Sequence, residues 1–289
     1  MPHADEQSRV PLTPRTTGGT DAPMISLMRY VRLYRVFARN NLVRELEFRV
    51  NFWAKVFTNI GWLASFIAFL KIIFANTGAV GSWSEGQVFL LFGTFLLVRS
   101  LMDVLFTQNL SKIPELIRMG TMDFVLTKPV PSLFYVSARY LSLDELGSLF
   151  GAFGVLGYSV WLLKLSPSPA QVVAWMVLVL LGLLTLYSIQ LLLMTLSFWL
   201  IRLDNLSALT DTVVFVARYP PDIFPALLRF FTSYVIPLAF VAAIPASVLL
   251  GKRAMVPSLL LSFAVTASFL TLAAYFWGFA TRAYTSASS

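Results

Sequence analysis

The chain has 289 residues, of which 57% are hydrophobic and only 12% are charged, and its net charge is +8. Soluble domains carry about 25% charged residues, so this composition indicates a polytopic membrane protein. The absence of cysteine excludes disulfides, thiolate metal sites and cysteine nucleophiles. The single histidine, His3, lies in a polar terminal segment and does not suggest a histidine-built site. The excess of Lys and Arg suits the cytoplasmic loops of a membrane protein, so we expect no nucleic acid partner.

Two segments precede the first long apolar run. Residues 1–27 are rich in Pro, Thr, Gly and Asp, and we expect a disordered cytoplasmic tail there. Residues 28–51 place aromatic and leucine side chains at the i, i+3, i+4, i+7 spacing of one helix face, with arginines opposite. A basic amphipathic helix before a span is typical of the membrane interface, where its rings enter the acyl boundary. We therefore interpret residues 28–51 as an interfacial elbow helix.

Residues 52–281 are predicted to form a transmembrane domain with six spans, followed by a short tail at 282–289. About 20 apolar residues cross the hydrocarbon core of a bilayer, and most of the predicted spans reach that length. Five spans are clear from the sequence alone: Phe52–Phe74, Val88–Thr107, Tyr140–Leu163, Val172–Ile201 and Val256–Ala280.

The apolar stretch Pro225–Leu250 is broken by Pro237 and Pro245, and two interpretations remain open. It is either one kinked fifth span, or a re-entrant helical hairpin that follows a short fifth span at Leu206–Ala217. Irregular backbone is tolerated at membrane depth where protein covers it. The sequence thus predicts an all-α polytopic membrane protein with an amphipathic interfacial helix, six transmembrane helices and, in one version, a re-entrant hairpin before the last.

The distribution of Lys and Arg predicts the orientation, because cytoplasmic loops are enriched in both. With the N-terminus inside, 17 of the 22 basic residues lie on the cytoplasmic side, four lie outside, and Arg99 lies within the second span. In the hairpin version Arg218 and Arg229 move outward, and the split becomes 15 to six. Both versions place both termini in the cytoplasm.

The segment Gln108–Arg139 is the longest polar interruption between the apolar runs. It contains a short helical pattern with Pro114 near its start and Gly120 at its end, followed by a Lys-Pro-Val-Pro sequence. A loop of this length inside a compact domain usually has a function. Its position on the cytoplasmic side makes it a candidate surface through which another protein acts on this one.

The sequence lacks the motifs of several chemistries. It has no Gly-x-x-x-x-Gly-Lys-[Ser/Thr] phosphate cradle, no His-Glu-x-x-His and no Gly-x-Ser-x-Gly. Arg99 and Asp103 are four residues apart inside a span and can pair on one helix face. In a functional interpretation they line a translocation path or a dimer seam. In a structural interpretation they form an ion pair near the membrane interface in which each charge neutralises the other. Asp144 and Glu145 are interpreted as helix N-terminal charges within reach of Arg139.

Three stretches carry a resemblance to a known family. They are MGTMDFVLTKPVPSLFYVS at Met119–Ser137, ARYPPDIFPALLRFFTSYVIPLAFVAAIPASVLLG at Ala217–Gly251, and the ending WGFATRAYTSAS. Together with the order of apolar segments from Met28 to Ser288, they resemble the membrane-spanning permease subunits of bacterial type-2 ATP-binding-cassette (ABC) exporters. These stretches contain no catalytic residue.

The resemblance implies a bacterial inner-membrane protein that works with an ABC ATPase subunit and with a second permease copy or a sibling permease, among membrane lipids. It also implies that ATP binds the partner and that this chain binds no cofactor or metal. The Pro220–Gly251 stretch would be a re-entrant element, which favours the hairpin version. The loop after the second span would carry a coupling helix that docks on the ATPase, formed here by Ile113, Pro114, Glu115, Leu116, Ile117, Arg118 and Gly120.

Two other function classes are kept open. A secondary transporter predicts internal repeats and buried ionisable groups, but we see no clear repeat and a single charged pair. A membrane-embedded enzyme that modifies lipids requires a convergent polar cluster, for which Arg99, Asp103, Asp144 and Glu145 are the candidates. The exporter permease is the leading hypothesis.

Overall fold

The computed structural model describes residues 27–47, 49–200 and 206–284, and every named element among them is a helix. Five of these helices are long and apolar enough to cross a membrane, and a bent helix pair raises the number to six if it counts as one span. The predicted all-α membrane fold is therefore confirmed. The predicted terminal tails fall mostly on residues 1–26 and 285–289, which lie outside the described residues, as does Arg202.

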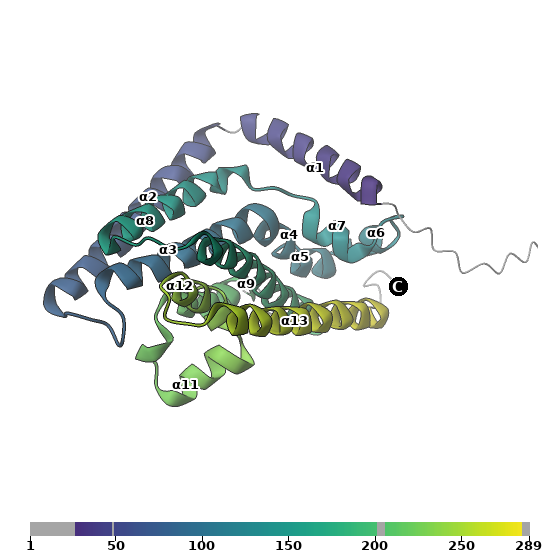
Figure 1. The fold of residues 1–289 in the computed structure, drawn as a ribbon. Helices are drawn as coiled ribbons and strands as arrows, with labels where there is room; N and C mark the ends of the chain where they lie inside the picture. The colour runs from purple at the N-terminus through teal and green to yellow at the C-terminus, as the bar shows by residue number, and fades with distance from the viewer. Residues whose placement is uncertain (1–26, 48, 201–205, 285–289) are drawn as a thin grey trace, which may run out of the picture.

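The interfacial helix corresponds to α1 (Leu27–Glu47), which forms the upper edge of the molecule with α2 in Figure 1. The rings of Tyr30 and Phe37 were predicted to enter the lipid. They also contact Phe134 and Tyr135 of the α7 helix (Ser132–Ala138), with ring centroids 4.8 and 6.2 Å apart, and their place in the lipid stays a prediction. Asn41 adds a hydrogen bond of 3.0 Å from its side-chain amide to the carbonyl oxygen of Arg139. The apolar face of α1 is thus partly covered by protein.

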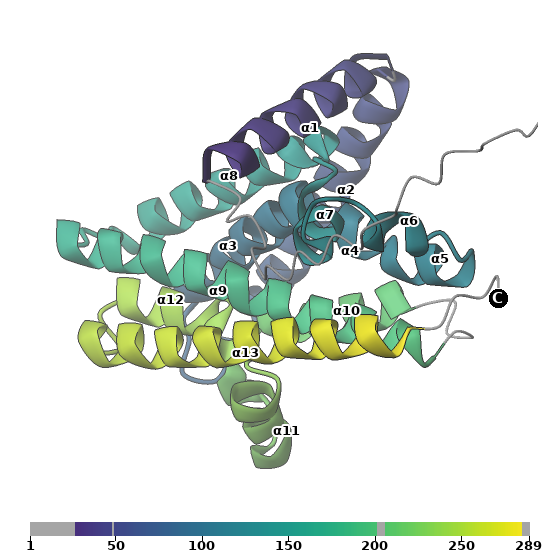
Figure 2. The same ribbon diagram turned by 90° about the vertical axis from the view of Figure 1, so that its right-hand side faces the viewer.

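The α3 helix is the centre of the bundle, and it packs along α8 and α9. In its most apolar stretch 78% of the residues are buried, against 11% in α2 and 17% in α13. The large exposed side chains of α2 and α13 therefore face lipid or another subunit. Figure 2 shows α9 and α13 running side by side beneath α3 and α8. The long helices are α2 (Arg49–Asn76), α3 (Glu85–Met102), α8 (Leu146–Leu163), α9 (Pro169–Thr195) and α13 (Met255–Ala283).

Local sequence sets where α9 begins. Ser168 precedes the helix and its hydroxyl accepts the Gln171 N–H at 3.3 Å, while the Gln171 side chain accepts the Ser168 N–H at 2.8 Å. Pro169 occupies the first turn, where a missing N–H costs no helical hydrogen bond. This capping box explains why the tight turn after α8 leads directly into a 27-residue helix.

The predicted loop Gln108–Arg139 is mostly helical. The second span was expected to end at Thr107, but an apolar helical path of 34 residues runs from Glu85 to Arg118. It passes from α3 through a π-helical turn, Asp103–Thr107, and then continues into the short helices that follow. These are α4 (Gln108–Leu110), α5 (Ile113–Arg118), α6 (Asp123–Leu126) and α7 (Ser132–Ala138), which gather at one end of the bundle in Figure 1. We call this the α5 end.

The segment between α9 and α13 does not form one continuous span. It begins with α10 (Leu206–Phe215) and includes α11 (Ala226–Phe230) and α12 (Ala243–Leu249). The helical stretch Ala226–Val235 meets Leu238–Leu249 at an angle of 70°. This bend lies at Pro237, which cannot donate a backbone hydrogen bond. In Figure 1, α11 projects below α12 and α13.

Both ends of this bent segment contact the loop between α2 and α3. Asp222 accepts a hydrogen bond from the Ser82 hydroxyl at 2.5 Å, and Lys252 donates to the Ser82 carbonyl oxygen at 3.0 Å. Residues 222–252 therefore leave and return at the same end of the bundle, as the re-entrant version predicts. We call this the α11 end. On this arrangement α10 and the turn to Arg218 serve as the short fifth crossing.

The re-entrant segment packs closely on α9 at a glycine. A Cβ atom added to Gly182 would lie 2.9 Å from the Phe240 carbonyl oxygen and 3.1 Å from that of Val241. Those backbone atoms cannot move away as a flexible side chain would. Gly182 thus permits the approach of α9 to irregular backbone, and α9 covers that backbone from lipid.

Candidate functional site

The α5 helix is short and both of its ends are fixed by the sequence. Pro114 lies in its first turn, where proline is well tolerated. Gly120 follows the helix with a φ of +67°, in the left-handed region that favours glycine. The Gly120 N–H donates to the Ile117 carbonyl oxygen at 3.1 Å, and the Met122 N–H donates to that of Leu116 at 3.0 Å. The helix is therefore closed by hydrogen bonds at its C-terminus.

The α5 helix has one buried and one exposed face. Ile113 and Ile117 are 0% and 4% exposed, because α5 packs against α9 and the turn that follows it. Glu115 and Arg118 are exposed. Ile117, one of the predicted coupling residues, lies four positions after Ile113 and shares its buried side. The predicted coupling residues thus divide into the buried Ile113 and Ile117, the half-buried Pro114, Leu116 and Gly120, and the exposed Glu115 and Arg118; their coupling role stays a prediction.

The exposed apolar side chains at this end come from the residues just after α5. Met119 is 62% exposed and Phe124 is 71% exposed. Lys128 is exposed beside them in sequence. Large apolar side chains among charged ones are typical of protein docking sites. We define the α5 surface as the exposed residues Glu115, Arg118, Met119, Phe124 and Lys128.

Arg99 links α3 to α10 inside the bundle. Its Nε lies 2.8 Å from Asp103 Oδ2, so the predicted i, i+4 pairing is confirmed. Its Nη2 lies 2.9 Å from Asp211 Oδ1 on α10, a contact that the sequence did not predict. Thr107 donates to the other Asp103 oxygen at 2.7 Å. The only sequence signal for the contact between Arg99 and Asp211 was that Asp211 is an acidic residue within the apolar stretch 206–217. The sequence does not show which helix packs against Asp211.

This ion-pair cluster lies at an irregular point of the helix. Asp103 is the first residue of the π-helical turn Asp103–Thr107, and single π-helical turns are frequent at functional sites. The same helical path leads from Arg99 to α5. The α5 surface and the Arg99 cluster therefore belong to one connected element, although they lie at different depths in the bundle.

A cavity of about 420 Å³ lies beside Arg99, between α2, α3, α8 and α10. Aromatic rings from these helices form much of its wall, including Trp62, Phe95, Phe150 and Phe215. Its volume falls within the range of about 300–1,000 Å³ of small-molecule pockets. The positive charge of Arg99 is neutralised by two carboxylates, so it is not available to a ligand in this aromatic-walled cavity. We call it the central cavity.

A second ion-pair group lies where α2 meets the start of α8. The ammonium group of Lys55 lies 2.5 Å from Asp144 and 3.2 Å from Glu145. Asn59 donates a hydrogen bond to Glu145 at 3.3 Å, and both Asn59 and Glu145 line the central cavity. Arg139 was expected to reach these carboxylates, but its guanidinium lies over two tyrosine rings. The carboxylates thus join α2 to α8 through Lys55.

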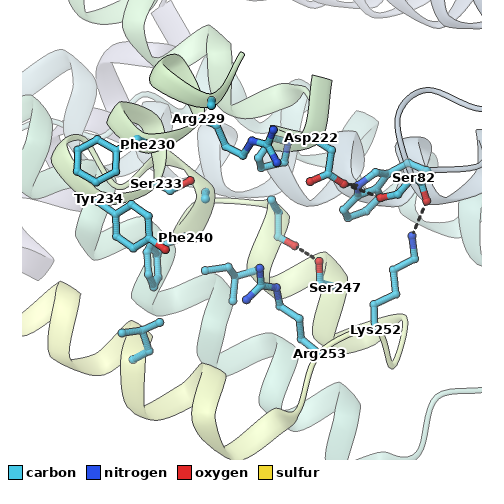
Figure 3. A pocket seen from close by; sticks show the side chains of 17 residues that line it. Ser82, Asp222, Arg229, Phe230, Ser233, Tyr234, Phe240, Ser247, Lys252 and Arg253 are labelled. Atoms are coloured by element: carbon cyan, nitrogen blue, oxygen red, sulfur yellow. Dashed lines mark hydrogen bonds between the residues drawn. The ribbon is translucent and has the colours of Figure 1, made fainter. Parts of the chain in front are cut away.

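A larger cavity, of about 510 Å³, lies at the α11 end (Figure 3). Asp222 stands at one side of it and accepts hydrogen bonds from the Ser82 hydroxyl and from the Trp83 indole N–H at 3.2 Å. Lys252 donates to the Gln87 side chain at 2.7 Å, in addition to Ser82. Desolvation by burial lowers the pKa of Lys252, while the attraction of Asp222 opposes that shift. We call this space the outer-end cavity.

The described residues contain no group of three or more His, Asp or Glu side chains that could hold a metal ion. The sites described above are instead an exposed surface, an ion-pair cluster and two cavities. An exposed surface of this kind can bind a partner protein, and cavities of this kind can bind ligands or allow the helices around them to move.

A family model described as "ABC-2 family transporter protein" matches residues 60–288. No curated protein and no solved structure matches the chain. The family match begins in α2 and extends past α13, so it includes the α5 surface, the outer-end cavity and the lining of the central cavity except Asn59. Because it spans most of the sequence, the chain belongs to the ABC-2 transporter family and is a multi-pass membrane permease that is not itself catalytic.

Proposed function

We propose that this permease is the transport subunit of an exporter and that a separate ABC ATPase drives it by docking on the α5 surface. Several observations support this proposal. The given sequence has no phosphate cradle, which agrees with ATP being bound by a separate subunit. The α5 surface presents Met119 and Phe124 among charged residues, as a docking site requires. Family membership disfavours the secondary-transporter and lipid-enzyme hypotheses.

The proposed orientation puts the α5 end in the cytoplasm of a bacterial cell, with both termini there and the protein in the inner membrane. The clustering of basic residues in residues 28–55 and 108–139 supports it. The re-entrant arrangement gives the 15-to-six split of Lys and Arg, which still favours this orientation. The outer-end cavity then opens toward the external leaflet.

The observation that carries the proposal is the helical path from the α5 surface to the Arg99 cluster. In the mechanism we propose, the ATPase subunits close on ATP and displace α5. Ile113 and Ile117 hold α5 against α9, so the displacement passes into the bundle. The π-helical turn at Asp103 gives α3 a point where it can bend. Movement there changes the pairing between Arg99 and Asp211, and with it the position of α10 beside the central cavity.

The path for the transported molecule would be completed by a second permease, either another copy or a sibling chain. The central cavity occupies only part of the bundle, and α2 carries large apolar side chains outside that cavity, including Phe57 and Phe69 at 69% and 47% exposure. A second subunit packed on this part of α2 would bury them and enclose a wider path. Transport is then a population shift between inward-facing and outward-facing arrangements.

The test is substrate-stimulated ATP hydrolysis by the complex of this chain with its ATPase partner, reconstituted in liposomes. We expect Glu115→Arg, which reverses a charge on the α5 surface, to reduce the stimulation about tenfold or more while the protein still inserts. Gly120→Pro should act similarly, because proline cannot adopt a φ of +67° and lacks the N–H that bonds to Ile117.

Gly78→Ala is the matched control, because a Cβ atom at Gly78 meets nothing within 4 Å and the residue lies in the loop at the α11 end. It should leave stimulation unchanged. Normal stimulation of hydrolysis in both α5 variants would refute the proposed role of this surface. Transport by the chain alone, without ATP, would refute the dependence on an ATPase.

A further inference from the structure

The outer-end cavity contains two cations that the protein does not neutralise. Arg229 of α11 and Arg253 before α13 line it and are both exposed. Within the described part of the chain, neither guanidinium group has a hydrogen-bond or ion-pair partner. In Figure 3 both guanidinium groups point into the space between α11 and the start of α13. By contrast, Lys252 and Asp222 are held by the hydrogen bonds described above, so these two arginines are the uncommitted charges of the cavity.

The opposite part of the cavity is apolar and aromatic. Phe230 and Tyr234, on α11 and its continuation, are 54% and 74% exposed. Leu261 on α13 is 51% exposed, and it lies six residues after the helix begins at Met255, which corresponds to about 9 Å along the axis. Figure 3 shows Phe230, Tyr234 and Phe240 gathered away from Ser82 and Lys252. The cavity is therefore polar where α13 begins and apolar farther along that helix.

The two halves suit a ligand that has a charged head and an apolar chain. Arginine presents a planar fork of donors that matches the oxygens of a phosphate group. The start of a membrane-spanning helix lies near the headgroup level of the bilayer, where basic residues attract anionic lipids. A neutral headgroup would leave two guanidinium groups uncompensated, and a free phosphate ion would leave the aromatic wall unused. A cavity of about 510 Å³ holds a headgroup with the upper part of a chain.

We propose that the outer-end cavity binds the phosphate headgroup of an anionic lipid between Arg229 and Arg253, with an acyl chain against Phe230, Tyr234 and Leu261. The lipid comes from the leaflet at the α11 end. Its head bridges α11 to the start of α13, so it holds the re-entrant segment against the last span. The site is defined by this chain's own residues and does not depend on the identity of an ATPase partner.

The test uses the purified full chain in detergent and measures lipid binding by native mass spectrometry. The probes are dioctanoyl phosphatidylglycerol, which is anionic, and dioctanoyl phosphatidylcholine, which is zwitterionic. If each arginine raises the affinity for the anionic headgroup about fivefold, phosphatidylglycerol should bind about 25-fold more tightly than phosphatidylcholine. Inorganic phosphate at equal concentration should not displace it, because the free ion gains nothing from the aromatic wall.

Variants assign the binding to this cavity. The double change Arg229→Gln and Arg253→Gln should remove most of the preference for phosphatidylglycerol, and the same positions changed to Lys should retain much of it. Arg282→Gln is the matched control, because Arg282 is exposed at the opposite end of α13. Tyr234→Ala should weaken both lipids by a similar factor, because it removes part of the apolar wall and leaves the charges in place.

Three results would overturn the proposal. The first is equal affinity of the unaltered chain for the two lipids. The second is a preference that survives in the double Gln variant while its elution profile shows a folded protein. The third is displacement of phosphatidylglycerol by inorganic phosphate at equal concentration, which would define a free-anion site instead of a lipid site.

Discussion

The central cavity and the outer-end cavity treat positive charge in opposite ways. In the central cavity Arg99 is neutralised by Asp103 and Asp211. In the outer-end cavity Arg229 and Arg253 have no such partner among the described residues. A cation inside a membrane-spanning helix is costly unless it is paired or hydrated, whereas one at headgroup level is cheap. In the orientation we propose, the difference in depth explains why Arg99 is paired within the protein while Arg229 and Arg253 are left for a ligand.

The comparison also separates two uses of an acidic side chain. Arg99 joins one span to another, so breaking its contact with Asp211 would release α10 from α3. Asp222 joins the re-entrant segment to the loop before α3 and leaves the two nearby arginines uncommitted. Changes in these groups should therefore differ in size, and the following predictions run from the largest expected effect to the smallest.

Arg99→Ala should have the largest effect, because it leaves Asp103 and Asp211 without their cation. Removing one member of a buried ion pair typically costs about 3–5 kcal/mol. We expect a loss of about 3 kcal/mol in the free energy of unfolding, since the Arg99 side chain is still 19% exposed. Denaturant titration in mixed micelles measures it.

A triple variant controls for the charges that Arg99→Ala leaves behind. Arg99→Met combined with Asp103→Leu and Asp211→Leu removes the whole cluster, and replacing an ion pair by apolar residues is often neutral. Its stability should return close to that of the unaltered chain, while ATP-driven transport stays low. A triple variant as unstable as Arg99→Ala would mean that the loss comes from packing instead of charge.

Asp222→Ala should have an intermediate effect. It removes the acceptor of two hydrogen bonds, from the Ser82 hydroxyl and the Trp83 indole, and hydrogen bonds to a charged group contribute about 1.5–3 kcal/mol each when partly buried. Asp222 is exposed, so we expect about 1–2 kcal/mol in total. Faster hydrogen exchange confined to residues 222–252 would accompany it. Unchanged exchange there would contradict the anchoring role of Asp222.

The double change Arg229→Gln and Arg253→Gln should have the smallest effect on stability. Exposed side chains without partners usually change the free energy of unfolding by less than about 0.5 kcal/mol. In lipid-free detergent we expect no measurable loss, and added phosphatidylglycerol should stabilise the unaltered chain but not the variant. A loss above about 1 kcal/mol without lipid would show that these arginines have structural partners, and the comparison between the cavities would fail.

The spans could be predicted because hydrophobic length is a property of the sequence itself. The pairing of Arg99 with Asp103 could be predicted too, because both lie on one helix at a spacing of four. Asp211 could not be assigned as a partner, since its position depends on how α10 packs beside α3. For the same reason the sequence did not show that Ile117 is buried against α9. The prolines of residues 225–250 indicated a break, and the contacts of Asp222 and Lys252 with Ser82 showed which end of the bundle it faces.

The most direct test of the proposed mechanism measures whether ATP binding by the ATPase docked on the α5 surface moves α10. The chain has no cysteine, so Thr127→Cys and Thr212→Cys, at two exposed positions, allow a pair of spin labels in one copy of the permease. In the complex with its ATPase, trapping ATP should shift the distance distribution between the labels, and the shift should disappear with Gly120→Pro. An unchanged distance in a complex that transports at the normal rate would contradict the mechanism.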